Sequence, residues 1–404
     1  MSELYLVFNA GSSSIKCSLF EMATPGEMVR LRRAQIDGIG SESSAAAAEQ
    51  NGGETLRQRW AQATSRDHAE AVQILLEWAD SQIGSRELNA CGHRVVHGGA
   101  SYGEPVVITD QVLSELERLT SLAPQHQPHS LAGIRAIQEF RPSLPQVACF
   151  DTAFHRTQAR LAQLFGLPHE VTDRGIYRYG FHGLSYEYIA SVLPRFDPVA
   201  AAGRAVVAHL GHGASLCALR AGKSVATTMG FSTLDGLPMG TRCGALDPAV
   251  VFHLMNEFDM TASNVENLLY ERSGLLGVSG LSADMRVLRS HDNNARAAEA
   301  IDLFVYRTVR EVSGLIGALG GIDALVFTAG IGENDATLRA DILRALAWLD
   351  FNLDEPANER GGPLLTRGPG PRAWVIPTDE ESIIAHHTRW IAQTATLEAI
   401  ERPS

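Results

Sequence analysis

The sequence predicts an α/β protein that folds as two similar domains. Strand-like apolar segments alternate with amphipathic helical segments along both halves of the chain. An apolar strand also runs through a tight glycine-containing turn into a second strand twice, at 6–16 and at 206–216. One such turn at the start of each half indicates a duplicated fold with a cleft between its two domains.

Length and composition limit the classes of protein to consider. A chain of 404 residues suits two domains rather than one core, and we place the boundary near residue 150. The formal net charge of −12 argues against nucleic acid or an anionic membrane as a partner. Neither a signal peptide nor an apolar run of about 18–20 residues is found, which favours a cytoplasmic protein. Five scattered cysteines are typical of reduced thiols.

Apolar spacing assigns the elements of the first half in order. Alternating residues predict a pair of strands at 4–8 and 15–20, whereas the low-complexity stretch 41–54 is expected to be an exposed loop. The helical spacing of Val72, Leu75, Leu76 and Ala79 predicts a helix over 68–83. The elements expected next are a buried strand at 91–96, helices at 110–121 and 129–140, and a strand at 146–150.

The second half repeats the alternation. It opens on the strand-turn-strand at 204–219 and continues with long helices at 247–258 and 295–318. A strand at 324–328 then leads into a glycine-containing turn at 329–334 and a helix from about 335. The last expected elements are a strand at 373–376 and a C-terminal helix from about 379.

Both tight turns have the composition of an anion-binding loop. Glycine permits φ > 0, so successive backbone N–H groups can converge on a phosphate. In the first turn Lys16, one of only two lysines, adds a point charge, and Asn9 is expected to face a metal ion or its water. The alternative is a hairpin whose glycine and serines only satisfy the geometry of the turn. The second turn, at 209–213, favours phosphate binding.

Arginine and histidine side chains form a second group of candidates. Arg94 adjoins a buried strand, and a half-buried guanidinium needs an anionic partner, which is either a substrate or an internal salt bridge. Asp151, His155, His182 and Arg242 lie next to glycines or at the ends of elements, where cleft residues occur. For any one of the histidines, a hydrogen-bonded place in the core is the alternative.

Three further segments suggest nucleotide or metal binding. Residues 330–334 follow a strand and precede a helix, which fits a nucleotide contact, although the full dinucleotide spacing is absent. Residues 284–286 contain a cation that either faces the site or forms a surface ion pair. At 378–381 a helix cap is the favoured interpretation, with a carboxylate ligand for magnesium as the alternative.

Taken together, these segments resemble the acetate kinase family, within the larger superfamily of acetate and sugar kinases, Hsp70 and actin. The matching segments, in chain order, are FNAGSSSIK, GHRVVHGG, CFDTAFH, RYGFHG, HLGHGAS, MGTRCG, SADMR, FTAGIGEN and VIPTDEE. The resemblance implies a duplicated actin-like (ribonuclease H-like) fold with an interdomain active-site cleft. It also implies ATP with Mg²⁺ (or Mn²⁺) and a homodimer. The domains would be 1–150, completed by a C-terminal helix at about 384–404, and 151–383.

The resemblance also implies roles for individual residues. The residues expected to be catalytic are Arg94, Asp151, His182 and Arg242, of which Asp151 would orient an arginine or the metal-bound water. Those expected near magnesium are Asn9 and Glu380. Those expected to bind ATP or ADP are Lys16, His209, Leu210, Gly211, His212, Gly213, Asp284, Met285, Arg286, Gly330, Ile331, Gly332, Glu333 and Asn334. Those expected at the acyl acceptor are Arg94, Val96, Gln125, Phe181 and Thr233.

The chain departs from the family pattern at three positions that concern specificity. His212 stands where the family has asparagine, and Gln125 and Thr233 stand where it has the leucine and proline of the methyl pocket. The reaction that the resemblance implies is reversible in-line transfer from ATP to acetate, giving acetyl phosphate and ADP. The alternatives are propionate or a hydroxy acid as acceptor, another phosphoryl donor, or an actin- or chaperone-like ATP switch.

Overall fold

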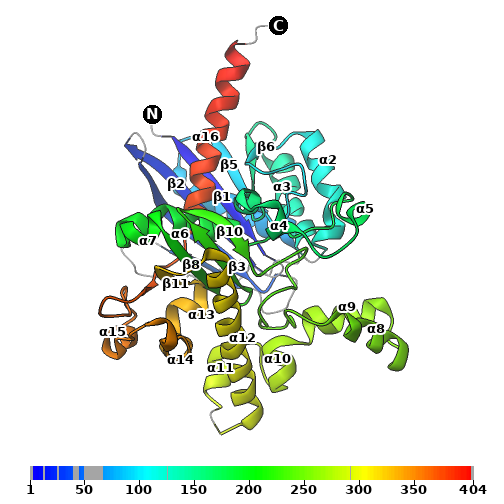
Figure 1. Ribbon diagram of the computed structural model, residues 1–404. Helices are drawn as coiled ribbons and strands as arrows, with labels where there is room; N and C mark the ends of the chain where they lie inside the picture. The colour runs from blue at the N-terminus through cyan, green and yellow to red at the C-terminus, as the bar shows by residue number, and fades with distance from the viewer. Residues whose placement is uncertain are drawn as a thin grey trace. The chain divides into compact units, whose positions relative to one another are not determined.

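The computed structural model describes residues 3–11, 14–24, 27–39, 45–49, 67–124, 126–291 and 293–401. The chain divides into two compact units, which we call unit 1 (Met1–Ala153 with Asp379–Ser404) and unit 2 (Phe154–Thr378). Each unit contains one mixed β-sheet with helices packed on it (Figure 1). The predicted α/β class is confirmed.

Unit 1 is built on a seven-stranded sheet of order β4-β3-β2-β1-β5-β7-β6. Its strands are β1 (Leu4–Ala10), β2 (Ser14–Thr24), β3 (Glu27–Asp37), β4 (Ala45–Glu49), β5 (Ala90–Val95), β6 (Val106–Val107) and β7 (Gln146–Phe150). Its helices are α1 (His68–Ile83), α2 (Asp110–Arg118), the 3₁₀ turn η1 (Thr120–Leu122), α3 (Gln127–Phe140) and α16 (Glu380–Glu401).

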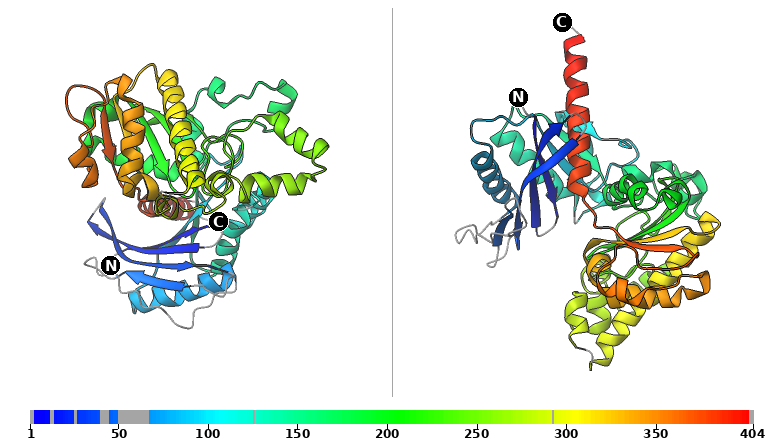
Figure 2. Two further views of the ribbon diagram at one scale, coloured as in Figure 1. Left: turned by 90° about the horizontal axis from the view of Figure 1, so that it is seen from below. Right: turned by 90° about the vertical axis from the view of Figure 1, so that its left-hand side faces the viewer.

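Helices cover both faces of this sheet, as Figure 2 shows for α1 and α16. Because side chains alternate along a strand, Leu4, Leu6 and Phe8 of β1 enter a core shared with α1 on one face. The other face receives α16, which packs on β1, β5 and β7. A side chain at Gly92 would meet Thr388 Oγ1 of α16 at 2.0 Å, so glycine is what allows the helix to approach the sheet here.

Unit 2 is built on a five-stranded sheet of order β10-β9-β8-β11-β12. Its strands are β8 (Arg204–Leu210), β9 (Ala214–Arg220), β10 (Lys223–Thr227), β11 (Ala324–Thr328) and β12 (Arg372–Val375). Its helices are α4 (Arg160–Gln163), α5 (His169–Thr172), α6 (Gly183–Phe196), α7 (Pro198–Ala202), α8 (Pro248–Glu257), α9 (Ala262–Glu271), α10 (Gly274–Ser279), α11 (Met285–Arg289), α12 (Ala295–Leu319), α13 (Ala329–Asn334), α14 (Ala336–Ala345), η3 (Ala347–Leu349) and α15 (Glu355–Glu359). The turn η2 (Ala153–Thr157) spans the boundary with unit 1.

The two sheets repeat one pairing pattern. In unit 1, β3, β2 and β1 pair antiparallel in turn, and β5 and β7 then extend the sheet in parallel. In unit 2, β10, β9 and β8 pair antiparallel, and β11 and β12 follow in parallel. The two predicted glycine turns lie at equivalent places in the two patterns. One joins β1 to β2 in unit 1, and the other joins β8 to β9 in unit 2. The duplication predicted from the two turns is therefore confirmed.

Three sequence predictions of local structure need correction. Part of the stretch 41–54 is the strand β4, paired with β3, because a short alanine run can extend a sheet edge; residues 41–44 and 50–54 lie outside the described residues. The turn predicted at 329–334 is itself the short helix α13. The helix predicted at 110–121 ends at Arg118 and is followed by η1.

Four of the five cysteines are buried and the fifth, Cys243, is partly exposed; all are free thiols, as the sequence predicts. None of the helices in the described ranges is long and apolar enough to cross a membrane.

Candidate active site

The candidate residues of unit 1 meet where β1, β5 and β7 end beside the start of α16. Arg94 Nε donates to both oxygens of Asp151, over 3.0 and 3.1 Å, and Nη2 donates to Oδ2 over 2.6 Å. Arg94 Nη1 donates to Asn9 Oδ1 over 3.2 Å, and Asn9 Nδ2 donates to Glu380 Oε2 over 2.9 Å. Four side chains from four elements are thus joined in one chain of hydrogen bonds.

Electrostatics keep this guanidinium charged. Burial acts to lower the pKa of Arg94, but the charges of Asp151 and Glu380 outweigh it and raise that pKa above its ordinary value. Burial raises the pKa of Asp151, and Arg94 opposes that shift. The internal salt bridge that the sequence left open therefore exists. It also orients Arg94, whose side chain remains 18% exposed and keeps access to a ligand.

Lys16 belongs to the same face of the sheet. It lies directly opposite Asn9 in the β1–β2 pairing, and directly opposite residues project to the same side. The turn between these strands is closed by a hydrogen bond from Gly11 N to Ser14 O over 2.8 Å. Ser12 and Ser13 of this turn lie outside the described residues.

The histidines on either side of Arg94 have structural roles. Burial lowers the pKa of His93 to about 4, so its ring is neutral at pH 7, and the ring stacks on Phe8 in the sheet interior. His97 is fully buried, and its Nδ1 accepts from Gly99 N over 2.8 Å. His155 is a further core residue, in unit 2: its ring nitrogens contact Ser224 Oγ and the Phe181 carbonyl, each at 2.9 Å. Burial lowers the pKa of His155 to about 4 as well, so neither His93 nor His155 supplies a cation to the site at pH 7.

The candidate residues of unit 2 surround the second glycine turn. Gly211 N donates to Gly213 O over 3.1 Å, which closes the turn. A Cβ on Gly213 would lie 3.1 Å from His182 Nε2 and 3.8 Å from Arg242 Nη1, so both side chains border its backbone. His182 itself adopts φ 57° at the residue preceding α6, and its ring stacks on His209 with centroids 4.2 Å apart.

Hydrogen bonds fix the orientation of these histidines. His182 Nδ1 lies 2.8 Å from Ser215 Oγ, and the same hydroxyl contacts the phenol of Tyr186. His209 Nδ1 lies 2.8 Å from Ser185 Oγ, which in turn contacts Thr378. The sequence analysis missed Ser215 and Tyr186, because a buried serine in a strand and a tyrosine in a helix carry no motif of their own.

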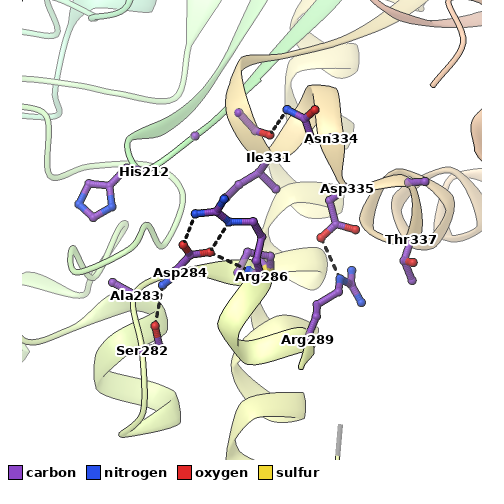
Figure 3. A pocket seen from close by; sticks show the side chains of 14 residues that line it. His212, Ser282, Ala283, Asp284, Arg286, Arg289, Ile331, Asn334, Asp335 and Thr337 are labelled. Atoms are coloured by element: carbon purple, nitrogen blue, oxygen red, sulfur yellow. Dashed lines mark hydrogen bonds and ion pairs between the residues drawn. The ribbon is translucent and has the colours of Figure 1, made fainter. Parts of the chain in front are cut away.

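A cavity of about 1020 Å³ is lined in part by Gly211 and His212 of the same turn. It lies wholly within unit 2, between α11, α13 and the start of α14, and Figure 3 shows the side chains around it. Its volume is at the upper end of the range for small-molecule sites. The residues that line it are Gly211, His212, Ser282, Ala283, Asp284, Met285, Arg286, Arg289, Gly330, Ile331, Asn334, Asp335, Ala336 and Thr337.

Most of the predicted nucleotide residues line this cavity. Asp284 pairs with Arg286 over 2.6 Å, so the surface ion pair exists, yet Arg286 is 90% exposed and free to turn to a ligand. Glu333 instead accepts backbone N–H groups of Ala329 and Thr378, over 2.8 and 3.1 Å. His209 and Leu210 are buried behind the turn. Sequence analysis did not identify Arg289 and Asp335, which pair over 2.8 Å in the cavity wall.

His212 occupies the position where the family pattern has asparagine. Its carbonyl accepts from Gly240 N over 3.2 Å, and its ring lies so close to Gly240 that a Cβ there would meet Nδ1 at 2.7 Å. Loss of water around the ring, followed by the charge of Arg242, lowers the pKa of His212. The ring is therefore neutral at pH 7 and offers one donor and one acceptor, as an asparagine amide does.

The predicted acceptor residues are described only in part. Val96 and Phe181 are almost fully buried, in unit 1 and unit 2 respectively, and Gln125 lies outside the described residues. The carbonyl of Thr233 accepts from Arg242 Nη1 over 3.1 Å. This contact ties the segment that contains Thr233 to the arginine expected at the phosphoryl group.

A magnesium ion fits the donor set around Glu380. Among the described residues, no group of three or more histidine, cysteine, aspartate or glutamate side chains could enclose a metal. Mg²⁺ does not need one, because it keeps several waters and takes one or two carboxylates together with substrate phosphates. Glu380 supplies such a carboxylate, and Asn9 holds it through the 2.9 Å hydrogen bond.

Comparison with known proteins agrees with this arrangement. The model of the Acetokinase family matches residues 4–386. An acetate kinase of Rhodopseudomonas palustris is 49% identical over 96% of this chain and 98% of its own length, and one of Halothermothrix orenii is 40% identical over 96% and 99%.

Among solved structures, a propionate kinase of Francisella tularensis aligns with a TM-score of 0.87 at 33% identity, over 96% of this chain and 100% of its own. Porphyromonas gingivalis acetate kinase gives 0.84 at 33% identity, over 96% and 99%. The fold class is the duplicated actin-like α/β fold expected from the sequence. This chain is a member of the acetokinase family and, with it, of the phosphotransferases that use a carboxyl group as acceptor.

Proposed function

We propose that this protein catalyses reversible transfer of the γ-phosphoryl group of ATP to acetate, giving acetyl phosphate and ADP. The observation that carries the proposal is the second glycine turn. His182 and Arg242 border the backbone of this turn at Gly213, and Gly211 and His212 of the same turn line a cavity of about 1020 Å³. A nucleotide in that cavity with its phosphates at the turn would present its terminal phosphoryl group to a guanidinium and an imidazole.

Catalysis in this proposal is charge stabilisation and alignment. A carboxylate is already ionised at pH 7, so no base is needed to activate it. The barrier comes from bringing two anions together, and arginines next to the transferred group lower it. Arg242 and Arg94 would supply these charges, Asp151 would orient Arg94, and His182 would donate a hydrogen bond. Lys16 would contact phosphate oxygens.

Magnesium would be held by Glu380, with Asn9 orienting the carboxylate. When bound, the ion neutralises part of the phosphate charge. The fit of the donor set supports Mg²⁺, and Mn²⁺ satisfies the same oxygen ligands.

The acceptor and donor are tested together by trapping acyl phosphate with hydroxylamine. We expect kcat/KM to be highest for acetate with ATP and lower for propionate, because one methylene discriminates by about 10–200-fold. Propionate is the second candidate, favoured by the similarity to a propionate kinase. A preference for a hydroxy acid as acceptor would overturn the assignment of acetate. A preference for pyrophosphate as donor would overturn the assignment of ATP. Absence of any hydroxamate would favour an ATP switch.

We also propose that the protein is a homodimer that associates through α8. None of the ten residues of this helix is buried, although it is rich in apolar side chains. Phe252 and Phe258 are 64 and 65% exposed. Apolar clusters of this kind mark protein interfaces. Light scattering should give a dimer for the native chain and a monomer for Phe252→Glu combined with Phe258→Glu.

A further inference from the structure

Three consecutive carboxylates lie at the start of α16. The proposed reaction uses only the middle one. Asp379 precedes the helix, and Glu380 and Glu381 are its first two residues. Glu380 contacts Asn9 of β1, whereas its two neighbours contact other strands of unit 1. Glu380 therefore lies between two residues that are each held by side chains of the unit 1 sheet.

Glu381 is held by three side chains. It is 3% exposed, and its Oε1 lies 3.0 Å from Arg33 Nη2. Its Oε2 accepts from Ser18 Oγ over 2.9 Å and lies 3.7 Å from Arg30 Nη2. A buried carboxylate with this many partners has one position, because leaving it without them is costly.

Asp379 has two functions at the same helix end. It forms an ion pair with Arg30. It also accepts from Ser382 N over 3.1 Å and from Ser382 Oγ over 2.7 Å, which makes it the N-cap of α16. The cap that sequence analysis favoured is therefore present, and an arginine holds the cap residue.

Both arginines come from β3, on the face of the sheet that α16 covers. Ser18 lies opposite Arg33 in the β2–β3 pairing, so the two side chains project to the same side. The guanidinium of Arg30 lies over the ring of Phe20, 5.2 Å from its centroid. Stacking of this kind orients the planar guanidinium.

We propose that Arg30 and Arg33 are positioning residues for the divalent cation. They fix Asp379 and Glu381, one residue before and one after Glu380, and thereby set the Glu380 carboxylate. The inference rests on the proposed function, in which Glu380 is the metal ligand. Residues that orient a metal ligand typically change metal affinity by about 10–100-fold when they are replaced.

The test is direct binding of Mn²⁺ in the presence of ADP, measured from the electron paramagnetic resonance of the free ion. We expect Arg33→Gln to weaken Mn²⁺ binding about 10–100-fold, and Arg33→Lys, which keeps the charge, to weaken it less. At saturating metal, kcat should stay within about threefold of the native value, since Arg33 touches no reacting group. Arg32→Gln is the matched control, because adjacent strand residues face opposite sides. Within the described part of the chain, the Arg32 side chain is hydrogen-bonded only through Nη1, to the Leu31 carbonyl.

Three outcomes separate the inference from the function on which it rests. Native-like Mn²⁺ affinity in Arg33→Gln, with affinity lost in Glu380→Gln, would overturn the positioning role alone. Native-like affinity in Glu380→Gln, or no Mn²⁺ binding by the native protein with ADP, would overturn the metal assignment and the inference with it. If Arg33→Gln does not fold, Arg30→Gln decides. Its ion pair with Asp379 is about one-quarter exposed, and unchanged Mn²⁺ affinity there would overturn the proposal.

Discussion

Arg94 and Asp151 form a two-point ion pair at the ends of the adjacent parallel strands β5 and β7. Nε and Nη2 of the arginine both donate to the carboxylate, and Asp151 N donates to the Val95 carbonyl over 3.1 Å. The aspartate is 1% exposed and therefore cannot itself reach a substrate. In the proposed reaction, Asp151 would therefore act by holding Arg94 in one orientation.

Asp151→Asn should lower kcat by about 100-fold, because it weakens the alignment of Arg94 while leaving the arginine in place. The measurement is steady-state acyl phosphate formation, with circular dichroism to confirm the fold. Asp80→Asn removes an exposed ion pair with Arg141 and serves as the control, with native kinetics expected. A native kcat for Asp151→Asn would show that the ion pair does not orient Arg94.

Arg242→Ala should lower kcat by at least 100-fold while the protein stays folded. An arginine that stabilises a transferred phosphoryl group is worth about 10³–10⁵ in rate, or roughly 4–7 kcal/mol. Arg272→Ala, at an exposed residue after α9, is the matched control. Turnover of the Arg242 variant close to native would exclude Arg242 from the role proposed here.

Ser215→Ala should lower kcat by about 10–100-fold, because Ser215 orients the ring of His182. Burial raises the pKa of Tyr186 well above its ordinary value, so the phenol stays protonated and can donate to Ser215. The serine can then donate to His182 Nδ1, which leaves the ring proton on Nε2, beside Gly213. Tyr186→Phe should have a smaller effect.

The tautomer of His182 gives an independent check of this relay, by which we mean the hydrogen bonds from Tyr186 to Ser215 and from Ser215 to His182. Nitrogen NMR of labelled histidine should find the His182 proton on Nε2 in the native protein and a mixture of tautomers in Ser215→Ala. A proton on Nδ1 in the native protein would contradict the relay.

Stability should fall as the pH drops below about 6.5. Burial lowers the pKa of both His93 and His155 to about 4, from an ordinary value of 6.5. Between these two pKa values the unfolded chain binds more protons than the folded one. The contribution of these histidines to the free energy of unfolding is therefore fully present above pH 6.5 and is lost as the pH falls from 6.5 through 4. Each histidine accounts for about 3 kcal/mol over that range.

Urea unfolding at pH 7.5 and pH 5.0 measures this effect. His155→Gln should reduce the difference between the two pH values, and His169→Gln, at an exposed residue of α5, is the matched control. An equal pH dependence in the native protein and His155→Gln would refute the contribution of His155.

The sequence predicted the fold because its apolar periodicity is strong where the sheets are. Helix 68–83 and the strands at 146–150 and 324–328 agree with the structure residue for residue. Segment 329–334 was mistaken for a turn because two glycines in six residues disfavour a helix. Glu333 compensates by accepting from Ala329 N at the start of α13.

Site residues were predictable where the residue type itself requires a partner. They were missed where only the pairing of strands brings distant residues together. Arg94 had to have an anionic partner, and Asp151 provides it. The strand β3, which carries Arg30 and Arg33, was not identified, because its alternating arginines gave no apolar period. Only the register of β3 against β2 brings these arginines to the beginning of a helix more than 340 residues later in the chain.

The return of the chain at Asp379 has a consequence for biosynthesis. Helix α16 covers β1, β5 and β7, yet it is translated after the whole of unit 2. A nascent polypeptide therefore exposes one side of its earliest sheet until α16 has left the ribosome. Premature termination before residue 379 would leave that surface bare and open to chaperones or proteases.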